Sequence, residues 1–190
     1  MDSDALLRDV TSRRSFFRGL GLGVAGGTAT LLSACGSDAA PGAARADAEA
    51  DAELLNGALD LEGVVIAAYR AGGPRLDGEL AVTGRHFLEQ EREHAEALRR
   101  AIRDLGAKPN RGRAADLPQL RDARAVLRFA VDLERTFVAA YLDMLPRLRA
   151  PALRGRVAAI LTNEAQHVSV LEAALGEQPA RGAFVTGTRA

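Results

Sequence analysis

Ionisable residues recur in this 190-residue chain at a spacing that suits a metal site. Glu91 lies three residues before His94, and the same Glu-x-x-His pattern returns 73 residues later as Glu164 and His167. On a helix, a separation of three residues places both side chains on one face, with a rise of about 4.5 Å between them. Carboxylate and imidazole ligands without a thiolate suit iron or manganese better than a structural zinc ion.

A single glutamate precedes each of these pairs, and each of the two interrupts an apolar helix face. Glu62 directly follows Leu61, and Glu134 lies one turn after Ala130. No Lys or Arg falls on the inward faces, so four ionised glutamates buried there would cost many kcal/mol. Two divalent cations balance four carboxylates if both imidazoles are neutral. The sequence therefore predicts two divalent metal ions, iron in preference to manganese, bound by Glu62, Glu91, His94, Glu134, Glu164 and His167. The alternative is a bundle whose polar residues face solvent or no longer bind metal.

The segments around these residues are two copies of one helical hairpin. Residues 58–69 and 130–141 are identical at seven of twelve positions, including the glutamate and a tyrosine. Leu98 also matches Leu171 at the offset of the Glu-x-x-His pairs. Each hairpin therefore carries one glutamate on its first helix and a Glu-x-x-His pair on its second.

Apolar residues at three- and four-residue steps predict four helices, with Gly or Pro near their ends. The connection after the second helix, residues 106–120, contains two Pro, two Gly and no helical period. Fully extended it would reach on the order of 50 Å, which is enough to cross the length of a bundle. The prediction is an all-α four-helix bundle of two hairpins joined by a long crossover. The helices are expected at about residues 47–71, 77–105, 122–145 and 152–175.

The first 34 residues read as an export signal, which we exclude from the fold. Residues 12–18, with Arg13 and Arg14 as the pair, resemble the twin-arginine consensus. Residues 19–34 form an apolar segment shorter than the roughly 20 residues that span a bilayer. The Leu-Ser-Ala-Cys sequence that ends at Cys35 resembles a bacterial lipobox, in which the cysteine is acylated and becomes the new N-terminus. The alternative is an uncleaved anchor with an incidental cysteine.

This signal predicts an exported protein that is lipid-anchored to the cell membrane on its extracytoplasmic face. The twin-arginine export machinery is then a partner. From Cys35 onward the chain has 21 basic and 22 acidic residues, so attachment must come from the lipid and not from a polybasic patch. The predicted segments are a signal peptide (1–34), a flexible tether (35–46), the helical domain (47–176) and a C-terminal tail (177–190). Phe184 and Val185 of the tail are expected to pack back on the bundle.

Charge and cysteine content exclude several other classes of protein. The whole chain has 25 basic and 25 acidic residues and no basic block, so nucleic acid is not an expected partner. Cys35 is the only cysteine, so no disulfide can form within the chain. The sequence leaves a homodimer open.

One glutamate from each of two helices, with Glu-x-x-His from each of the other two, resembles the ferritin-like di-iron and di-manganese carboxylate proteins. Over residues 47–176 the chain is similar to bacterial exported ferritin-like domain proteins, which are related to ferritins, bacterioferritin, rubrerythrin and manganese catalase. The resemblance implies that Glu91 and Glu164 bridge the metals, that Glu62 and Glu134 are terminal ligands, and that each metal has one histidine.

The same resemblance implies an oxidoreductase site that oxidises ferrous iron or reacts with dioxygen or peroxide. The alternative is a non-catalytic lipoprotein module that binds metal or a partner protein. A storage cage is disfavoured because every N-terminus of a closed shell would have to meet the membrane.

Other polar residues near the repeats receive smaller roles. Tyr69 and Tyr141 each lie seven residues beyond a glutamate on the same face, where they could hydrogen-bond a ligand, be oxidised by the metal centre or simply pack in the core. Asp60 and Asp132 point to a different face, which favours caps or inter-helix pairs. A solvated position is expected for His86, Glu89, Glu93 and Glu96.

Overall fold

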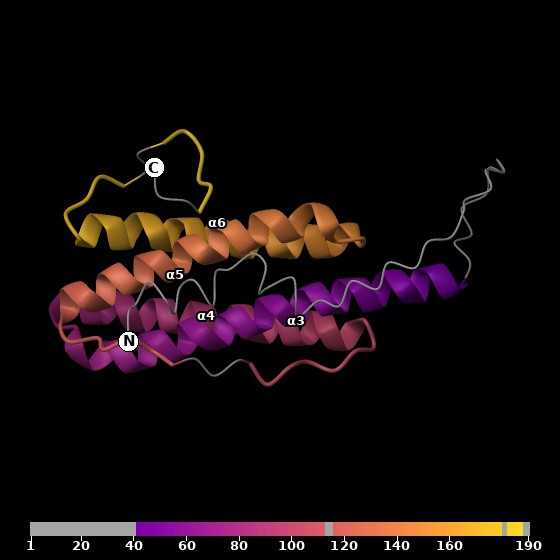
Figure 1. The fold of residues 1–190 in the computed structure, drawn as a ribbon, viewed down its shortest axis with the longest axis horizontal. Helices are drawn as coiled ribbons and strands as arrows, with labels where there is room; N and C mark the ends of the chain where they lie inside the picture. The colour runs from indigo at the N-terminus through magenta and orange to yellow at the C-terminus, as the bar shows by residue number, and fades with distance from the viewer. Residues whose placement is uncertain (1–40, 113–115, 180–181, 188–190) are drawn as a thin grey trace.

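The chain folds as an all-α four-helix bundle, as the sequence predicts (Figure 1). The structure is a computed structural model that describes residues 41–112, 116–179 and 182–187. Two single-turn 3₁₀ helices, η1 and η2, follow the first and third long helices. The helices are α3 (Pro41–Gly72), η1 (Gly73–Arg75), α4 (Gly78–Asp104), α5 (Ala123–Met144), η2 (Leu145–Arg147) and α6 (Pro151–Ala174).

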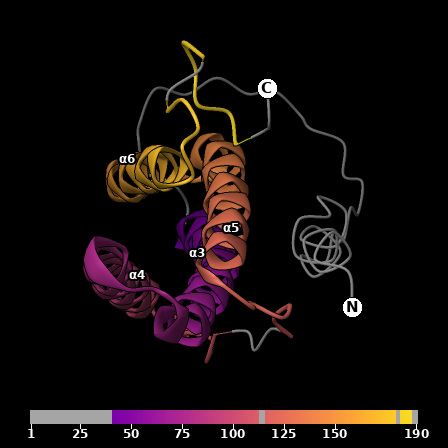
Figure 2. The ribbon, with the colours of Figure 1, turned by 90° about the vertical axis from the view of Figure 1, so that its left-hand side faces the viewer.

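The helices pack as the two predicted hairpins. α3 packs along α4, α5 packs along α6, and the first helices of the two hairpins, α3 and α5, pack against each other. The view along the bundle shows these pairs end on (Figure 2). Apolar side chains from all four helices fill the centre, and the fully buried ones include Leu55, Leu59, Leu98, Ile102, Phe137 and Met144.

Proline and glycine end the helices close to the predicted positions. Pro74 in η1 and Pro146 in η2 lack the N–H group that a continuing helix needs, so each hairpin turns there. Gly106 follows α4 with φ +77°, a conformation that favours glycine. At the start of α5, Asp122 caps the helix by accepting a hydrogen bond from the backbone N–H of Ala125 at 2.8 Å.

The crossover between α4 and α5 is fastened to α3. Asn56 accepts a hydrogen bond from the Asn110 backbone at 2.7 Å, and the Asn110 side chain donates to Asp60 at 3.0 Å. A Cβ atom on Gly112 would lie 3.5 Å from the Cα of Gly63, so the crossover passes close to α3 at this glycine. In the second hairpin the residue that corresponds to Gly63 is Arg135. No crossover passes over this position, and the Arg135 side chain pairs with Glu172 of α6. Asp60 thus serves an inter-element contact, as expected, and not the metal cluster.

Asp51 ties the first hairpin to the turn of the second. Its carboxylate accepts hydrogen bonds from the backbone N–H groups of Arg149 at 2.7 Å and Ala150 at 2.9 Å. Asp51 is 1% exposed, so these two bonds satisfy a buried charge immediately before α6.

The first described helix begins earlier than the sequence predicts. α3 starts at Pro41, so residues 41–46, which were expected to belong to the tether, are helical. This stretch is rich in alanine, the strongest helix former, and Pro is favoured in a first turn. Residues 42–46 are exposed, so helix propensity and not burial accounts for them. The predicted signal peptide and Cys35 lie outside the described residues.

The tail is irregular over its described residues, as expected, but Phe184 does not pack into the bundle. Its side chain is 86% exposed and that of Val185 is 49% exposed. Both line a surface hollow of about 710 Å³ between the tail and the outer sides of α5 and α6. Within the part of the chain that the structure covers, no helix has the length and apolar character needed to span a membrane.

Candidate metal centre

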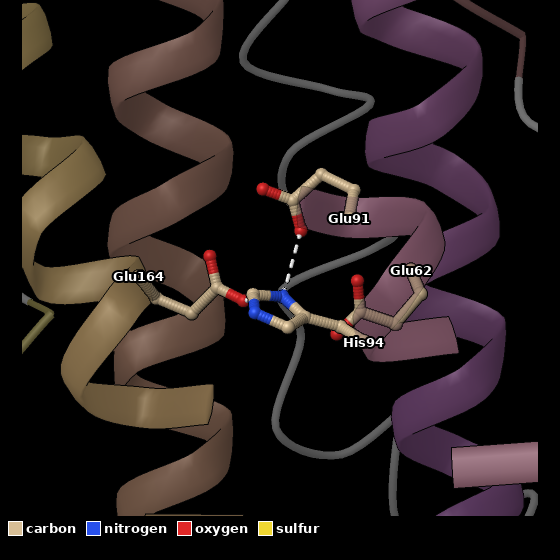
Figure 3. A group of neighbouring side chains, drawn as sticks. All are labelled: Glu62, Glu91, His94 and Glu164. Atoms are coloured by element: carbon tan, nitrogen blue, oxygen red, sulfur yellow. Dashed lines mark hydrogen bonds and ion pairs between the residues drawn. The ribbon is translucent and has the colours of Figure 1, made fainter. Parts of the chain in front are cut away.

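The bundle brings all six predicted ligands together at its centre. They form two overlapping groups, and within each group the candidate ligand atoms lie within 4.8 Å of one another. Figure 3 shows the side chains of the first group pointing toward one another from α3, α4 and α6. The first group is Glu62, Glu91, His94 and Glu164, and the second is Glu91, Glu134, Glu164 and His167.

Helix geometry explains the convergence. His94 follows Glu91 by three positions on α4, which places both side chains on the inward face about one turn apart. The same holds for Glu164 and His167 on α6. Glu91 and Glu164 belong to both groups, and their role as bridging ligands stays a prediction.

The cluster is almost fully shielded from water. All four glutamates are 0% exposed and His167 is 1% exposed. The side chain of His94 is 13% exposed, which makes it the most accessible of the six. Four carboxyl groups in such a place require compensating positive charge.

Histidine nitrogens lie against the glutamate oxygens. His94 Nδ1 is 3.2 Å from Glu91 and 3.0 Å from Glu164. His167 Nδ1 is 2.9 Å from Glu91, 3.3 Å from Glu164 and 3.5 Å from Glu134. Each histidine therefore faces the carboxylates with the same nitrogen.

Two tyrosines hydrogen-bond the remaining glutamates crosswise between the hairpins. Tyr69 of α3 donates to Glu134 of α5 at 2.6 Å, and Tyr141 of α5 donates to Glu62 of α3. One oxygen of each glutamate is thereby fixed, and the other makes no hydrogen bond. A hydrogen bond to a candidate ligand is one of the roles that the sequence suggests for Tyr69 and Tyr141.

Burial and the closeness of the six groups shift the pKa values of several of them. Burial lowers the pKa of both histidines, but the adjacent carboxylates outweigh it. They raise the pKa of His167 to about 12 and that of His94 to about 9. Burial raises the pKa of Glu164, yet the two histidines lower it to about 2.

Glu62 and Glu134 shift in the opposite direction from Glu164. Burial, followed by repulsion from Glu164 and Glu91, raises the pKa of both well above the usual value. Burial and the neighbouring glutamates also raise the pKa of Tyr69 and Tyr141, so both phenols stay protonated as donors. The raised pKa values of the two histidines and of Glu62 and Glu134 mean that protons can balance part of the negative charge of this cluster.

The donor set fits a pair of divalent cations. Six buried polar atoms within the described residues have no hydrogen-bond partner, and all six belong to this cluster. Four of the six meet only other members of the cluster, as ion pairs at 2.9–3.3 Å, and buried polar atoms are almost always hydrogen-bonded, so this group indicates a ligand. The six atoms are one oxygen each of Glu62, Glu91 and Glu134, both oxygens of Glu164, and Nδ1 of His167. Oxygen and imidazole donors of this kind suit iron or manganese.

Two residues outside the predicted ligand set contact the cluster. Gln90 lies 2.9 Å from His167 Nε2 through its side-chain oxygen, and the Phe87 ring stacks on the His167 ring at a centroid distance of 4.0 Å. The only feature of the sequence that could have indicated a role for Gln90 is its position directly before Glu91. By contrast His86, Glu89 and Glu93 are exposed, as expected, and Glu96 is half-buried beside arginines.

Comparisons with known proteins agree with this architecture. The family model described as "Ferritin-like domain" matches residues 50–177. The comparison with curated proteins finds no match.

Three solved structures share the fold. A bacterioferritin of Desulfovibrio desulfuricans, in a structure concerned with its diiron site in different catalytic states, has a TM-score of 0.67 and 21% identity over 70% of this chain and 82% of its own. A conserved hypothetical protein of Mycobacterium tuberculosis has a TM-score of 0.64 and 21% identity over 73% of this chain and 99% of its own. A ferritin-like, diiron-carboxylate protein of Bacillus anthracis has a TM-score of 0.61 and 23% identity over 68% of this chain and 97% of its own.

Proposed function

Because this chain belongs to the ferritin-like domain family, we propose that it binds two divalent metal ions, iron in preference to manganese, and oxidises ferrous iron or reacts with dioxygen or peroxide. The observation that carries this proposal is the set of six buried atoms that make no hydrogen bond, all of them on predicted ligands. A helical scaffold without a metal would gain stability from apolar residues at these positions, because unpaired buried carboxylates are costly.

Each residue of the cluster has a role in holding the metals. Four carboxylates neutralise two divalent cations. Glu91 and Glu164, shared by both groups, would hold both ions. Glu62 and Glu134 would each hold one ion, while a tyrosine keeps each carboxylate oriented.

Burial of the ligands supports reaction chemistry at this place. A bound pair of ferrous ions supplies two electrons, the number that reduces dioxygen to hydrogen peroxide or hydrogen peroxide to water. The protein excludes bulk water from the ligands, and its tyrosines keep the terminal carboxylates oriented. His94, the most exposed ligand, marks the side on which protons and small molecules reach the cluster.

The test measures metal first and turnover second. Metal per chain is determined by mass spectrometry on natively expressed protein, and oxygen or peroxide consumption is followed after addition of ferrous iron. Two metals per chain and consumption are expected. The variant Glu91→Gln should lose both, whereas Glu93→Gln, an exposed glutamate on the same helix, should retain both. Bound metal without consumption would favour the non-catalytic module, and absence of metal would overturn the proposal.

We further propose that the protein is exported by the twin-arginine machinery and lipid-anchored through Cys35 on the extracytoplasmic face. The support is the order of the two sequence signals, with Arg13 and Arg14 before the apolar segment and Cys35 after it. Cys35→Ser should move the protein from the membrane fraction to the soluble fraction. Retention of the variant in the membrane would argue for an uncleaved helix instead.

A further inference from the structure

The duplication is symmetric at the ligands and asymmetric around them. The offset of 73 residues that pairs His94 with His167 also pairs Phe87 with Ile160 and Gln90 with Asn163. Only one histidine therefore has an aromatic ring and a glutamine at the neighbouring positions of the opposite helix.

His167 is held on two sides in addition to the carboxylates. Its Nε2 lies 2.9 Å from the side-chain oxygen of Gln90. Because an amide oxygen only accepts, this contact places a proton on Nε2 and leaves Nδ1 as the metal-facing nitrogen. The Phe87 ring stacks on the imidazole, with a centroid distance of 4.0 Å and an interplanar angle of 25°. The ring of His167 thus has one defined orientation before any metal binds.

His94 lacks this support. Of the residues that the structure describes, only Glu91 and Glu164 contact its ring by hydrogen bonds or ion pairs. Its side chain is 13% exposed, against 1% for His167. Asn163, the counterpart of Gln90, has a side chain one methylene shorter and is not hydrogen-bonded to His94 across the bundle.

We propose that the two metal positions are unequal: the inner half-site binds its ion first and retains it, and the outer half-site binds second and exchanges with solvent. The inner half-site is Glu91, Glu134, Glu164 and His167, and the outer half-site is Glu62, Glu91, Glu164 and His94. Gln90 is the positioning residue that sets the difference. This inference rests on the proposed function, because it requires the cluster to bind two metals.

Preorganisation is the physical reason for the order of binding. A ligand whose ring is already oriented loses little freedom when the metal binds, and a partner on its second nitrogen makes the imidazole a better donor. Loss of such a partner lowers metal affinity by about 10- to 100-fold. The exposed edge of His94 gives water and competing ligands access to the second ion.

The experiment is a titration of the metal-free full chain with manganese(II), in which free ion is counted by electron paramagnetic resonance. The parent chain should show two separate binding steps. Gln90→Leu, which removes the acceptor, should weaken the first step by about 10- to 100-fold, while Gln90→Glu, which keeps an acceptor, should restore most of it. Asn163→Leu, the change at the equivalent position, should leave both steps unaltered.

A second readout separates positioning from a general loss of structure. In the manganese-free protein, ¹H–¹⁵N spectra of the imidazoles should show a slowly exchanging Nε2 proton on His167 in the parent, hydrogen-bonded to Gln90, and a faster exchange of that proton in Gln90→Leu. Two equal binding steps in the parent, or equal effects of Gln90→Leu and Asn163→Leu, would overturn this inference and leave the proposed function standing. Absence of any binding by the parent would overturn both.

Discussion

Replacing Glu62 by glutamine should have opposite effects on stability and on metal binding. Glu62 is 0% exposed, one oxygen accepts a hydrogen bond from Tyr141, and the other has no hydrogen-bond partner. Glutamine has the same shape and keeps an oxygen that accepts from Tyr141. Its amide also replaces an acid whose pKa is raised by burial and then by repulsion from Glu164 and Glu91, so the protein in chelator should become more stable.

The size of this gain follows from the raised pKa of Glu62. A carboxyl group that titrates at 4.5 when unfolded and stays protonated in the fold costs at most about 3.4 kcal/mol at pH 7. The titration of Glu62 is coupled to that of neighbouring groups, so the full cost does not fall on Glu62 alone. We therefore expect Glu62→Gln to raise the free energy of unfolding by about 1–3 kcal/mol at pH 7. The sign depends on pH: the cost is absent below pH 4.5 and grows as the pH rises, so Glu62→Gln should gain stability at pH 7 and little at pH 4.

The assay is urea unfolding of both proteins, first with a chelator and then with saturating manganese(II). At 100 times the dissociation constant, metal stabilises the parent by about 2.7 kcal/mol. The variant lacks one anionic ligand, and a 100-fold weaker affinity would reduce its gain to about 0.4 kcal/mol. Metal should therefore stabilise the variant by about 2 kcal/mol less than the parent.

Asp60→Asn is the matched control, because Asp60 lies on the same helix and hydrogen-bonds Asn110 outside the cluster. It should change stability by less than about 1 kcal/mol and leave the metal-induced gain as in the parent. Our reasoning would be refuted if Glu62→Gln were less stable than the parent in chelator, or if metal stabilised the two equally.

Three further predictions concern the contacts around the cluster. Tyr141→Phe frees the oxygen of Glu62, so metal affinity measured by competition with a chelator should fall by about 10-fold or more, and an unchanged affinity would exclude this orienting contact. Metal binding should release protons, because the pKa of His94 is about 9 and that of His167 about 12, and both must become neutral ligands. Calorimetry in buffers of different ionisation enthalpy counts these protons, affinity should weaken as the pH falls, and a buffer-independent heat would contradict the assignment. Asp51→Ala removes two hydrogen bonds before α6 and should lower the free energy of unfolding by about 2–3 kcal/mol with metal content unchanged; loss of metal would show that the link also shapes the site.

The internal repeat made the cluster predictable from sequence. One Glu-x-x-His could lie on a solvated face, but two copies within one duplicated hairpin place six ionisable residues on inward faces. The apolar period then determined the four helices, and Pro74 and Pro146 determined the turns. The six side chains do lie together in the bundle, and their role as metal ligands stays a prediction.

The sequence alone does not determine which side chains of different helices contact each other. Tyr69 lies seven residues from Glu62, about 10.5 Å along the helix, so its hydroxyl has to find a partner on another helix. The sequence does not reveal that this partner is Glu134 of the other hairpin. Gln90 was missed for the same reason, because its partner His167 lies on a helix 77 residues away in the chain.

Segments without a buried face were also predicted less well. The start of α3 depends on alanine propensity in exposed residues, which competes with coil by only a few tenths of a kcal/mol per residue. Phe184 was expected to pack on the bundle, but its side chain is exposed. The core is already filled by the four helices, so an apolar side chain in the tail has no space there.

The most direct test of the central claim is a crystal structure of natively expressed protein with anomalous data collected at the iron and manganese edges. Our account predicts two anomalous peaks inside the bundle, both within bonding distance of Glu91 and Glu164, one near His94 and the other near His167. Absence of peaks there, or metal bound only at the surface with the four glutamates turned away from one another, would contradict it.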